Sequence, residues 1–245
     1  MFILYSILLN LSLAILGYLI GSFNIAIILS KRYKKDDVRN HNSGNAGATN
    51  SLRTYGVKFA LIVFIFDALK SLIPILITVS IFNHVIPSFV NKYYLFSHII
   101  GLGVIIGHIF PLYHNFKGGK GVASSVGFLM SLNPLIFLIA AIIFFSVFFI
   151  WKYVSLASIL TAFLMIPFIF IPWMILNFSG KWINVLGFIG GEITKFWYLQ
   201  GIIYSIIALI VIVSHHSNIK RLINHTEKKM LSKKQQKLKE QNNNK

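Results

Sequence analysis

The sequence predicts an all-α integral membrane protein of about seven transmembrane helices, with the N-terminus outside and the C-terminus in the cytoplasm. Of its 245 residues, 56% are hydrophobic and only 12% are charged, whereas an ordinary soluble domain has about 25% charged residues. The mean hydropathy is +0.73. Apolar runs longer than a core helix recur along the chain, so lipid is the expected solvent for most of it.

These apolar runs give the positions of the expected crossings. The first run, residues 2–29, exceeds the roughly 20 residues that span the hydrocarbon, and its cations follow it, which excludes a signal peptide. Residues 121–151 are too long for one crossing and short for two. We expect a break at Asn133-Pro134, because proline lacks a donor and disfavours helix in the preceding residue. The remaining helices are expected near 57–82, 94–115, 121–132, 134–151, 155–175 and 198–214.

The Lys and Arg residues predict the orientation. With seven crossings, 19 of the 23 fall on one side, which carries residues 31–58, 116–120, 152 and the C-terminal tail. The other side carries three, Lys92, Lys181 and Lys195, and Lys70 lies inside a predicted helix. By the positive-inside rule the richer side is cytoplasmic. Most of the Gly, Ser, Asn and His clusters lie there too, so we expect the chemistry on that face.

The chain is expected to form one transmembrane domain, residues 1–222, followed by a flexible basic tail, residues 223–245. The net charge of +17 fits anionic lipid or anionic substrates better than nucleic acid, because the tail lacks aromatic residues between its cations. The sequence has no cysteine, which excludes disulfides and thiolate sites. No histidine has a Glu or Cys partner at metal-ligand spacing, so we expect no metal and no cofactor.

The first polar cluster begins at Asp37 and extends to Gly56. At its centre is Asn42-Ser43-Gly44-Asn45-Ala46-Gly47-Ala48-Thr49-Asn50, in which small residues allow close backbone approach and the others supply hydroxyl and amide donors. This composition favours an oxyanion site. A surface turn with a helix N-cap at Ser43 or Thr49 explains the same residues about equally well. The candidate ligand-binding residues here are Ser43, Asn45, Thr49, Asn50 and Arg53.

The second polar cluster precedes a predicted helix. It consists of Gly107-His108-Ile109-Phe110-Pro111 and then Phe116-Lys117-Gly118-Gly119-Lys120-Gly121. Two lysines separated by glycines, next to a helix N-terminus, combine positive charge with free amides and suit a phosphate. The spacing is not that of a Walker A loop, because His114 and Gly121 stand at two of its defining positions. An ordinary positively charged loop remains the alternative.

The third polar cluster lies at the exit of the last crossing, in the run His215-His216-Ser217-Asn218-Ile219-Lys220-Arg221-Leu222. On a continuing helix, His215 and Asn218 share a face that Arg221 extends. A histidine at a helix C-terminus is otherwise a common partner of the helix dipole. Ser155, just after Trp151-Lys152, adds one hydroxyl on the same side of the membrane.

Two further patterns have structural explanations. Asp67 and Lys70 lie three residues apart inside a predicted crossing, where we expect them to pair with each other or face the bundle interior. The pairs Gly17/Gly21 and Gly103/Gly107 match the small-xxx-small spacing of closely packed helices.

Taken in order, these segments resemble the bacterial acyl-phosphate:glycerol-3-phosphate acyltransferases, integral membrane enzymes of phospholipid synthesis. The resemblance rests on DVRNHNSGNAGATNSLRTYG (37–56), GHIFPLYHNFKGGKGVASSVG (107–127), WKYVSLASI (151–159) and HHSNIKRL (215–222). Three departures are visible. Asn42 and His225 stand where the family pattern has glycine, and residues 173–198 form a longer connection than usual.

The resemblance implies that acyl phosphate donates its acyl group to the 1-hydroxyl of sn-glycerol 3-phosphate, giving 1-acyl-glycerol 3-phosphate and phosphate. It implies a multi-pass protein of the bacterial cell membrane, functional as a monomer, with membrane lipids and the two substrates as its only partners. By the family pattern, Arg53, Lys120 and Ser155 hold the phosphate of glycerol 3-phosphate. Ser43, His215 and Asn218 orient its hydroxyls, and the amides of Lys117, Gly118, Gly119, Lys120 and Gly121 hold the acyl phosphate.

Within this resemblance, we expect His215 and Ser43 to be catalytic. None of the eight histidines is followed by Asp at the HxxxxD spacing of the other large acyltransferase class, so positioning and charge stabilisation must supply most of the rate. A permease or channel for organophosphates is the alternative from a different class of protein. A scaffold that docks soluble enzymes through its basic tail is a third interpretation.

Overall fold

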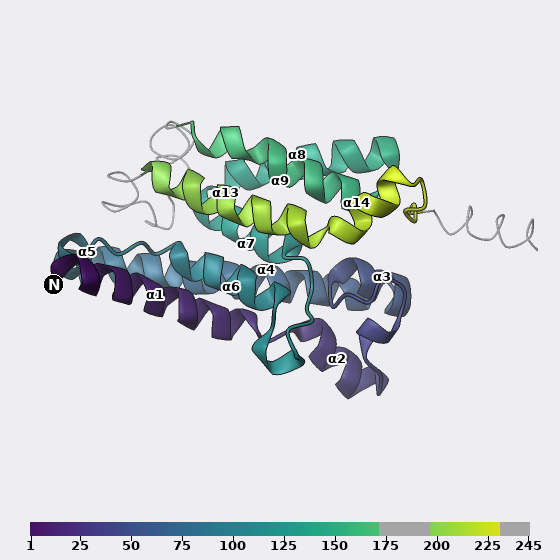
Figure 1. Cartoon of the computed structure of the whole chain (residues 1–245), viewed down its shortest axis with the longest axis horizontal. Coiled ribbons are helices and arrows are strands. Elements are labelled where there is room, and N and C mark those ends of the chain that lie inside the picture. The colour runs from purple at the N-terminus through teal and green to yellow at the C-terminus, as the bar shows by residue number, and fades with distance from the viewer. Residues whose placement is uncertain (172–196, 231–245) are drawn as a thin grey trace, which may run out of the picture.

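The computed structural model describes residues 1–171 and 197–230, and every described element in it is helical. The long helices run along the longest axis of the molecule, with α1, α4 and α6 on one side and α8, α9 and α13 on the other (Figure 1). The short helices α2, α3 and α14 gather at the end opposite the N-terminus. The helices are α1 (Phe2–Gly21), α2 (Ile25–Lys34), α3 (Ala48–Tyr55), α4 (Val57–His84), α5 (Pro87–Tyr93), α6 (Ile99–Ile109), α7 (Val122–Leu132), α8 (Pro134–Trp151), α9 (Val154–Ile169), α13 (Trp197–Ser214) and α14 (His216–Ile223), with 3₁₀ turns η1 (Val38–Asn40) and η2 (Leu112–His114).

The apolar segments appear where the sequence predicts them. Within the described ranges, four segments are long and apolar enough to cross a membrane, Phe2–Lys34, Val57–His84, Pro134–Trp151 and Trp197–Ser214. Three shorter apolar segments, Ile99–His114, Val122–Leu132 and Val154–Ile169, match the remaining expected helices. The fold is therefore that of a helical membrane protein, and the count of seven crossings stays a prediction. The end of the expected helix 155–175, and nearly all of the long connection 173–198, lie outside the described residues.

The expected break at Asn133-Pro134 is confirmed. Asn133 caps α8 by accepting a hydrogen bond from the amide of Leu135 at 2.8 Å, and Pro134 occupies the first turn of that helix, where its missing donor costs nothing.

The first apolar run, residues 2–29, forms the expected long apolar segment, but it is divided between two helices. Helix α1 ends at Gly21, and Asn24 caps α2 by accepting from the amide of Ile27 at 3.3 Å. The break is stabilised from another helix, because Lys70 donates to the carbonyl oxygens of Gly21 and Phe23, each at 3.3 Å. These carbonyls lie at a helix end and would otherwise lack partners.

The glycine pairs pack α1 against α6, as their spacing predicts. A Cβ added at Gly17 or Gly21 would collide with the backbone carbonyl of Ile100 or Val104, and one added at Gly103 or Gly107 would collide with that of Ala14 or Tyr18. The two backbones are thus in direct contact. Larger residues at these positions would force the helices apart.

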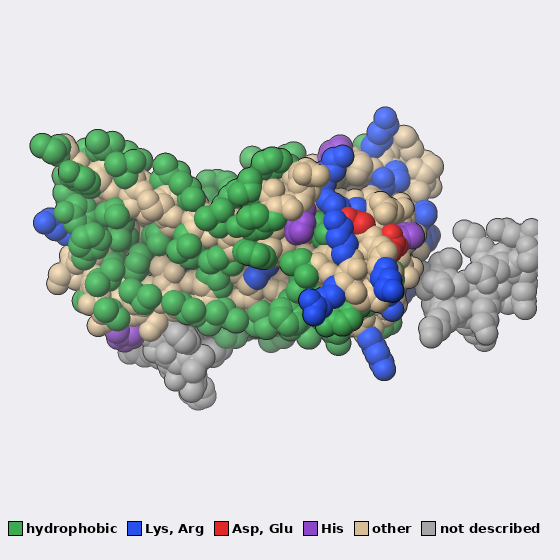
Figure 2. All heavy atoms as spheres, turned by 90° about the horizontal axis from the view of Figure 1, so that it is seen from below, with side chains coloured by type: hydrophobic (Ala, Val, Ile, Leu, Met, Phe, Trp, Pro, Cys, Tyr) green, Lys and Arg blue, Asp and Glu red, His purple; other side chains and the backbone are tan. Residues whose placement is uncertain are grey.

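The surface divides along the long axis. Hydrophobic side chains cover most of the length, and the charged side chains concentrate at the end that carries α2, α3 and α14 (Figure 2). Exposed apolar residues such as Ile7, Phe66 and Phe149 point outward from the long helices, as expected where lipid is the solvent. The polar end is where the three sequence clusters meet.

Candidate active site

A polar pocket of about 110 Å³ lies at the charged end and draws on all three sequence clusters. Ser43, Lys120 and His215, which come from three distant segments, line the same pocket. The predicted site residues that line it are Ser43, Asn45, Thr49, Asn50, Arg53, Lys120, Ser155, His215 and Asn218. Lys117, Gly118, Gly119, Gly121 and Arg221 belong to neighbouring positions but do not line it.

The first cluster folds as a turn leading into α3. Asn50, which is 2% exposed, ties this turn together, because its side chain accepts from the amide of Ser43 at 3.2 Å and donates to the carbonyl of Val38 at 2.8 Å. Gly47 is the N-cap of α3, without a side-chain hydrogen bond, so the alternative of an N-cap at Ser43 or Thr49 is wrong. Neither of these two hydroxyls has a hydrogen-bond partner in the described part of the chain, which leaves both available to a ligand.

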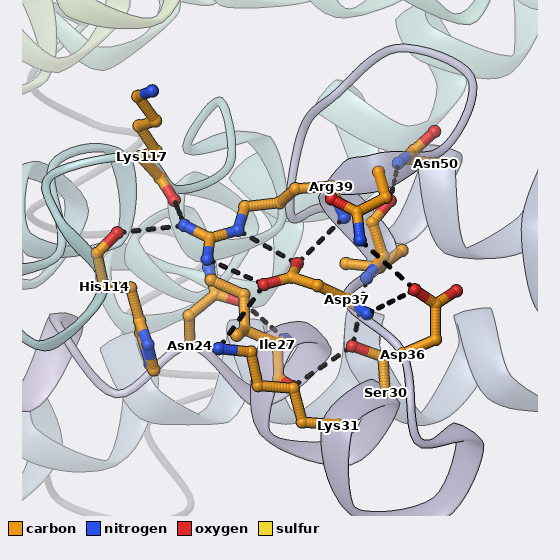
Figure 3. Close-up of polar contacts among 12 residues, drawn as sticks. Asn24, Ile27, Ser30, Lys31, Asp36, Asp37, Arg39, Asn50, His114 and Lys117 are labelled. Carbon is orange, nitrogen blue, oxygen red and sulfur yellow. Dashed lines mark hydrogen bonds and ion pairs between the residues drawn. The ribbon is translucent and has the colours of Figure 1, made fainter.

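An ion-paired bridge joins the first cluster to the second (Figure 3). Arg39 forms a two-pronged pair with Asp37, with an Nη2–Oδ2 distance of 2.7 Å. Its Nη1 donates to the carbonyls of His114 and Lys117, both at 2.9 Å. The hydrogen bonds that Arg39 donates to Asp37 lower the pKa of Asp37 to about 2, against the effect of burial. The bridge holds in place the loop that leads into the glycines, and no sequence motif predicted that Arg39 would bind these carbonyls.

The glycine loop uses most of its amides internally. The amides of Gly118 and Gly119 donate to the carbonyls of Ile109 and His108, each at 3.1 Å, and that of Lys117 donates to His114. These three amides therefore do not face a ligand, contrary to the expectation for the whole loop. The amides of Lys120 and Gly121, and those of the first turn of α7, have no acceptor among the described residues. The backbone amides that are available to an anion are therefore those at the junction of the loop with α7.

Lys120 is the pocket's main cation. Its ammonium hydrogen-bonds the side-chain oxygen of Asn218. Burial, and then the nearby Arg221, lower the pKa of Lys120 to about 8. Arg53 lines the same pocket, and one of its Nη atoms donates to the carbonyl of Lys228 at 3.2 Å. Two cations with free donors are what binding of a phosphate group requires.

The third cluster lies at a helix break rather than on a continuing helix. Helix α13 ends at Ser214, His215 adopts φ −93° and ψ 9°, and α14 begins at His216. His215 and Asn218 still converge, because the amide of Asn218 donates to the carbonyl of His215 at 2.8 Å and both side chains line the pocket.

The environment of His215 sets its tautomer. Its Nδ1 lies 2.8 Å from the carbonyl oxygen of Val211, and a carbonyl only accepts, so Nδ1 carries the proton. Burial, followed by the charge of Lys120, lowers the pKa of His215 to about 4. The ring is therefore neutral at pH 7 and presents an unprotonated Nε2 in the pocket.

Sequence reasoning missed Glu227, which lies in the segment expected to be a flexible tail. Its carboxylate is 8% exposed and accepts from Ser155 at 2.8 Å, Asn218 at 2.7 Å and Arg221 at 2.7 Å. Burial would raise the pKa of Glu227, but these hydrogen bonds outweigh it, and the pKa is lowered. Glu227 thus joins Ser155, from α9, to the third cluster. Glu227 is one of only six acidic residues in the chain, and this rarity was the one feature of the sequence that could have pointed to it.

A second cavity, of about 340 Å³, opens beside the polar pocket and is lined almost entirely by apolar side chains. The two cavities share Phe64, Val122 and Ser158. The apolar one lies between α7, α8, α9 and α13, with lining residues that include Leu129, Phe137, Ala141, Phe144, Tyr204 and Val211. A ligand that fills both must carry an anionic head and an apolar chain.

The expected pairing of Asp67 with Lys70 is confirmed. Lys70 Nζ lies 2.8 Å from Asp67 Oδ1, and both groups contact His108, a partner that the sequence did not predict. Asp67 and His108 also line the polar pocket.

The fold and the two cavities thus define a helical membrane protein whose polar, cationic site adjoins an apolar cavity and shares three lining residues with it. The family model described as "Glycerol-3-phosphate acyltransferase" matches residues 11–225. The chain belongs to this family, as the sequence resemblance indicated, and is an acyltransferase.

Individual relatives support this family assignment. A glycerol-3-phosphate acyltransferase of Mycoplasmopsis agalactiae is 54% identical over 95% of this chain and 98% of its own, and that of Mycoplasmopsis pulmonis is 42% identical over 91% and 93%. The crystal structure of PlsY, an integral membrane glycerol 3-phosphate acyltransferase, in its glycerol 3-phosphate form matches with a TM-score of 0.70 and 31% identity, over 91% of this chain and 96% of that one. A lysophosphatidic acid form of PlsY matches with a TM-score of 0.67.

Proposed function

We propose that this enzyme transfers a fatty acyl group from acyl phosphate to the 1-hydroxyl of sn-glycerol 3-phosphate, forming 1-acyl-glycerol 3-phosphate and inorganic phosphate. The observation that carries this proposal is that a cationic pocket adjoins an apolar cavity and shares lining residues with it. Acyl phosphate has an anionic head on an apolar chain, and the acyl product combines the same two features. The glycerol 3-phosphate and lysophosphatidic acid forms of PlsY fit this substrate and product.

Different residues of the pocket bind the two head groups. Lys120, Arg53 and Ser155 hold the phosphate of glycerol 3-phosphate. Ser155 does so by turning towards the phosphate the hydroxyl hydrogen that Glu227 otherwise accepts, and Glu227 keeps Asn218 in place. Ser43, His215 and Asn218 orient the glycerol hydroxyls. The acyl phosphate group lies at the start of α7, where the amides of Lys120 and Gly121 are free and the positive end of the helix faces it. Asn45 and Thr49 line the side of the pocket formed by the first cluster.

The reaction needs no strong protein base. The 1-hydroxyl oxygen attacks the acyl carbonyl carbon, the bond from that carbon to the phosphate oxygen breaks, and the hydroxyl proton ends on the departing phosphate. His215, with a pKa of about 4, is a weaker base than a phosphate monoester dianion, whose conjugate acid has a pKa of about 6. The unprotonated Nε2 of His215 therefore orients the hydroxyl by accepting its hydrogen bond, and the phosphate takes the proton.

The proposal includes an orientation in the membrane. Seven crossings in the bacterial cell membrane, with the N-terminus outside, put the charged end in the cytoplasm, where glycerol 3-phosphate is soluble. The concentration of Lys and Arg side chains at this end (Figure 2) agrees with the positive-inside rule. The three polar clusters of a single chain meet in this pocket, so the proposed site needs no second copy, and we propose that the enzyme acts as a monomer among membrane lipids.

Phosphate release by the purified protein tests the proposal. Detergent-solubilised enzyme is given palmitoyl phosphate and glycerol 3-phosphate, and released phosphate and the lipid product are measured. We expect release that depends on both substrates and a product acylated at the 1-position. Lys120→Met should remove nearly all activity, whereas Lys220→Ala, an exposed cation on α14, should leave it unchanged. Absence of release from folded wild-type protein refutes the proposal and is the result that a permease would give.

A further inference from the structure

His108 is a buried histidine that the assignments above do not use. It lies at the end of α6, is 2% exposed and lines the polar pocket. Its backbone carbonyl accepts the amide of Gly119 at 3.1 Å. A Cβ added at Gly119 would collide with His108 Nε2, so the missing side chain of this glycine leaves the space that the imidazole occupies.

The tautomer of His108 is set by Lys70. Lys70 Nζ is hydrogen-bonded to His108 Nδ1 at 2.8 Å, and an ammonium group only donates. Nδ1 is therefore the acceptor. Asp67 Oδ1, 2.8 Å from Lys70 Nζ, holds the ammonium group in place. Asp67 Oδ1 also lies near His108 Nδ1, but at 3.3 Å, and the shorter contact of 2.8 Å from Lys70 Nζ, in which Nδ1 accepts, sets the tautomer.

The proton of the neutral ring must then reside on Nε2. No acceptor for Nε2 is found in residues 1–171 or 197–230, although the imidazole is almost fully buried. His108 thus offers an N–H donor without a partner in a pocket built for anionic oxygen. Gly119, against which Nε2 packs, is followed directly by Lys120 and Gly121, whose amides have no acceptor among the described residues, and donor sets of this kind stabilise oxyanions.

We propose that His108 is a catalytic residue whose Nε2–H donates a hydrogen bond to the acyl carbonyl oxygen as negative charge develops there. This inference rests on the proposed function. As the glycerol oxygen bonds to the carbonyl carbon, the electron pair of the carbonyl moves onto its oxygen, which His108 stabilises without giving up its proton. When that pair returns, the bond to phosphate breaks, and phosphate leaves with the hydroxyl proton. Lys70 and Asp67 are positioning residues that hold the ring in its donor tautomer.

Two variants separate donation from packing. Glutamine is long enough to place an amide N–H near the Nε2 position, whereas asparagine reaches only the Nδ1 position. With palmitoyl phosphate and glycerol 3-phosphate, we expect His108→Asn to lower kcat about 10²- to 10³-fold, as for removal of one oxyanion donor. The KM for glycerol 3-phosphate should change less than about 3-fold, because only transition-state binding is lost. His108→Gln should recover at least tenfold of the lost kcat.

The possible results discriminate clearly. If His108→Asn folds with the wild-type melting temperature and keeps its kcat, or if both variants lose kcat equally, the inference is overturned. If the wild type itself does not turn over, it is the proposed function that fails. If the variants do not fold, ¹⁵N NMR of histidine-labelled wild type decides. A proton on Nε2 of His108 whose signal shifts when a non-hydrolysable acyl phosphonate binds supports the inference, and a proton on Nδ1 overturns it.

Discussion

The depressed pKa of Lys120 makes a quantitative prediction for the pH dependence of substrate binding. This pKa lies near 8, chiefly because the side chain is buried and secondly because Arg221 is close. A lysine loses its charge as the pH rises through its pKa, so the cationic pocket weakens above pH 8 and is fully charged below pH 7. The phosphate of the substrate loses its second negative charge below a pH of about 6. Binding should therefore be tightest between pH 6 and 8.

The size of the effect follows from the charged fraction. At pH 9, one unit above the pKa, roughly one enzyme molecule in ten carries the charged lysine, and an affinity that depends on this form falls by about tenfold. We expect the KM for glycerol 3-phosphate to rise about tenfold from pH 7 to pH 9, with a smaller change in kcat. The assay is phosphate release at saturating palmitoyl phosphate, corrected at each pH for spontaneous hydrolysis of the donor.

Arginine at this position is the matched control, because its guanidinium stays charged throughout this range. Lys120→Arg should bind less well at pH 7, since the planar head cannot reproduce the contact with Asn218, but its KM should be nearly flat up to pH 9. A wild-type KM that does not change between pH 7 and 9, or an equal rise in Lys120→Arg, would refute the assignment of Lys120 as the titrating phosphate ligand.

Three further predictions concern the supporting residues. Glu227→Gln should lower the unfolding free energy by about 2–3 kcal/mol, because one charge-assisted hydrogen bond is lost and the new amide N–H faces a donor. It should also lower kcat/KM. Chemical denaturation measures the first effect and steady-state kinetics the second, and an unchanged value in either contradicts the corresponding role of Glu227. His225, at φ 55°, pays the cost of a left-handed conformation, so His225→Gly should stabilise the protein by about 0.5–1 kcal/mol. His225→Ala is its control, and equal melting temperatures for the two variants would exclude strain at this position. Ala141→Phe should fill part of the apolar cavity and raise the KM for palmitoyl phosphate several-fold, with that for glycerol 3-phosphate unchanged; a parallel rise in both would place the acyl chain elsewhere.

The sequence predicted those parts of the fold that depend on local composition. Apolar runs mark the long helices because lipid exposure demands them, and Asn133-Pro134 marks a break through the missing donor of proline. The left-handed conformations of Asn42 (φ 51°) and His225 (φ 55°) fit the expectation of glycine at both positions. The break after Gly21 was missed, because it depends on Lys70 reaching the carbonyls from another helix.

The residues of the candidate site could be predicted from the sequence, but the hydrogen bonds among them could not. Ser43, Lys120 and His215 belong to recognisable clusters, and their convergence follows once those clusters lie at the same end of the bundle. Which amides of the glycine loop are free depends on the carbonyls of Ile109 and His108, which occupy two of them. Glu227 was missed for a related reason. Its segment has neither apolar periodicity nor a motif. Asn218 and Arg221 are near it in sequence, but its third partner, Ser155 of α9, is 72 residues away.

The two buried histidines show how the site separates its tasks without a strong base. His215 hydrogen-bonds a carbonyl through Nδ1 and so presents a bare nitrogen, whereas His108 accepts from an ammonium through Nδ1 and so presents an N–H. The partner of one ring nitrogen thus determines the chemistry of the other. An acyl transfer with a phosphate leaving group requires both an acceptor that aims the attacking hydroxyl and a donor for the carbonyl oxygen. Removing the charge of Lys70 takes away the donor to His108 Nδ1. This change should therefore lower kcat even though Lys70 touches neither substrate.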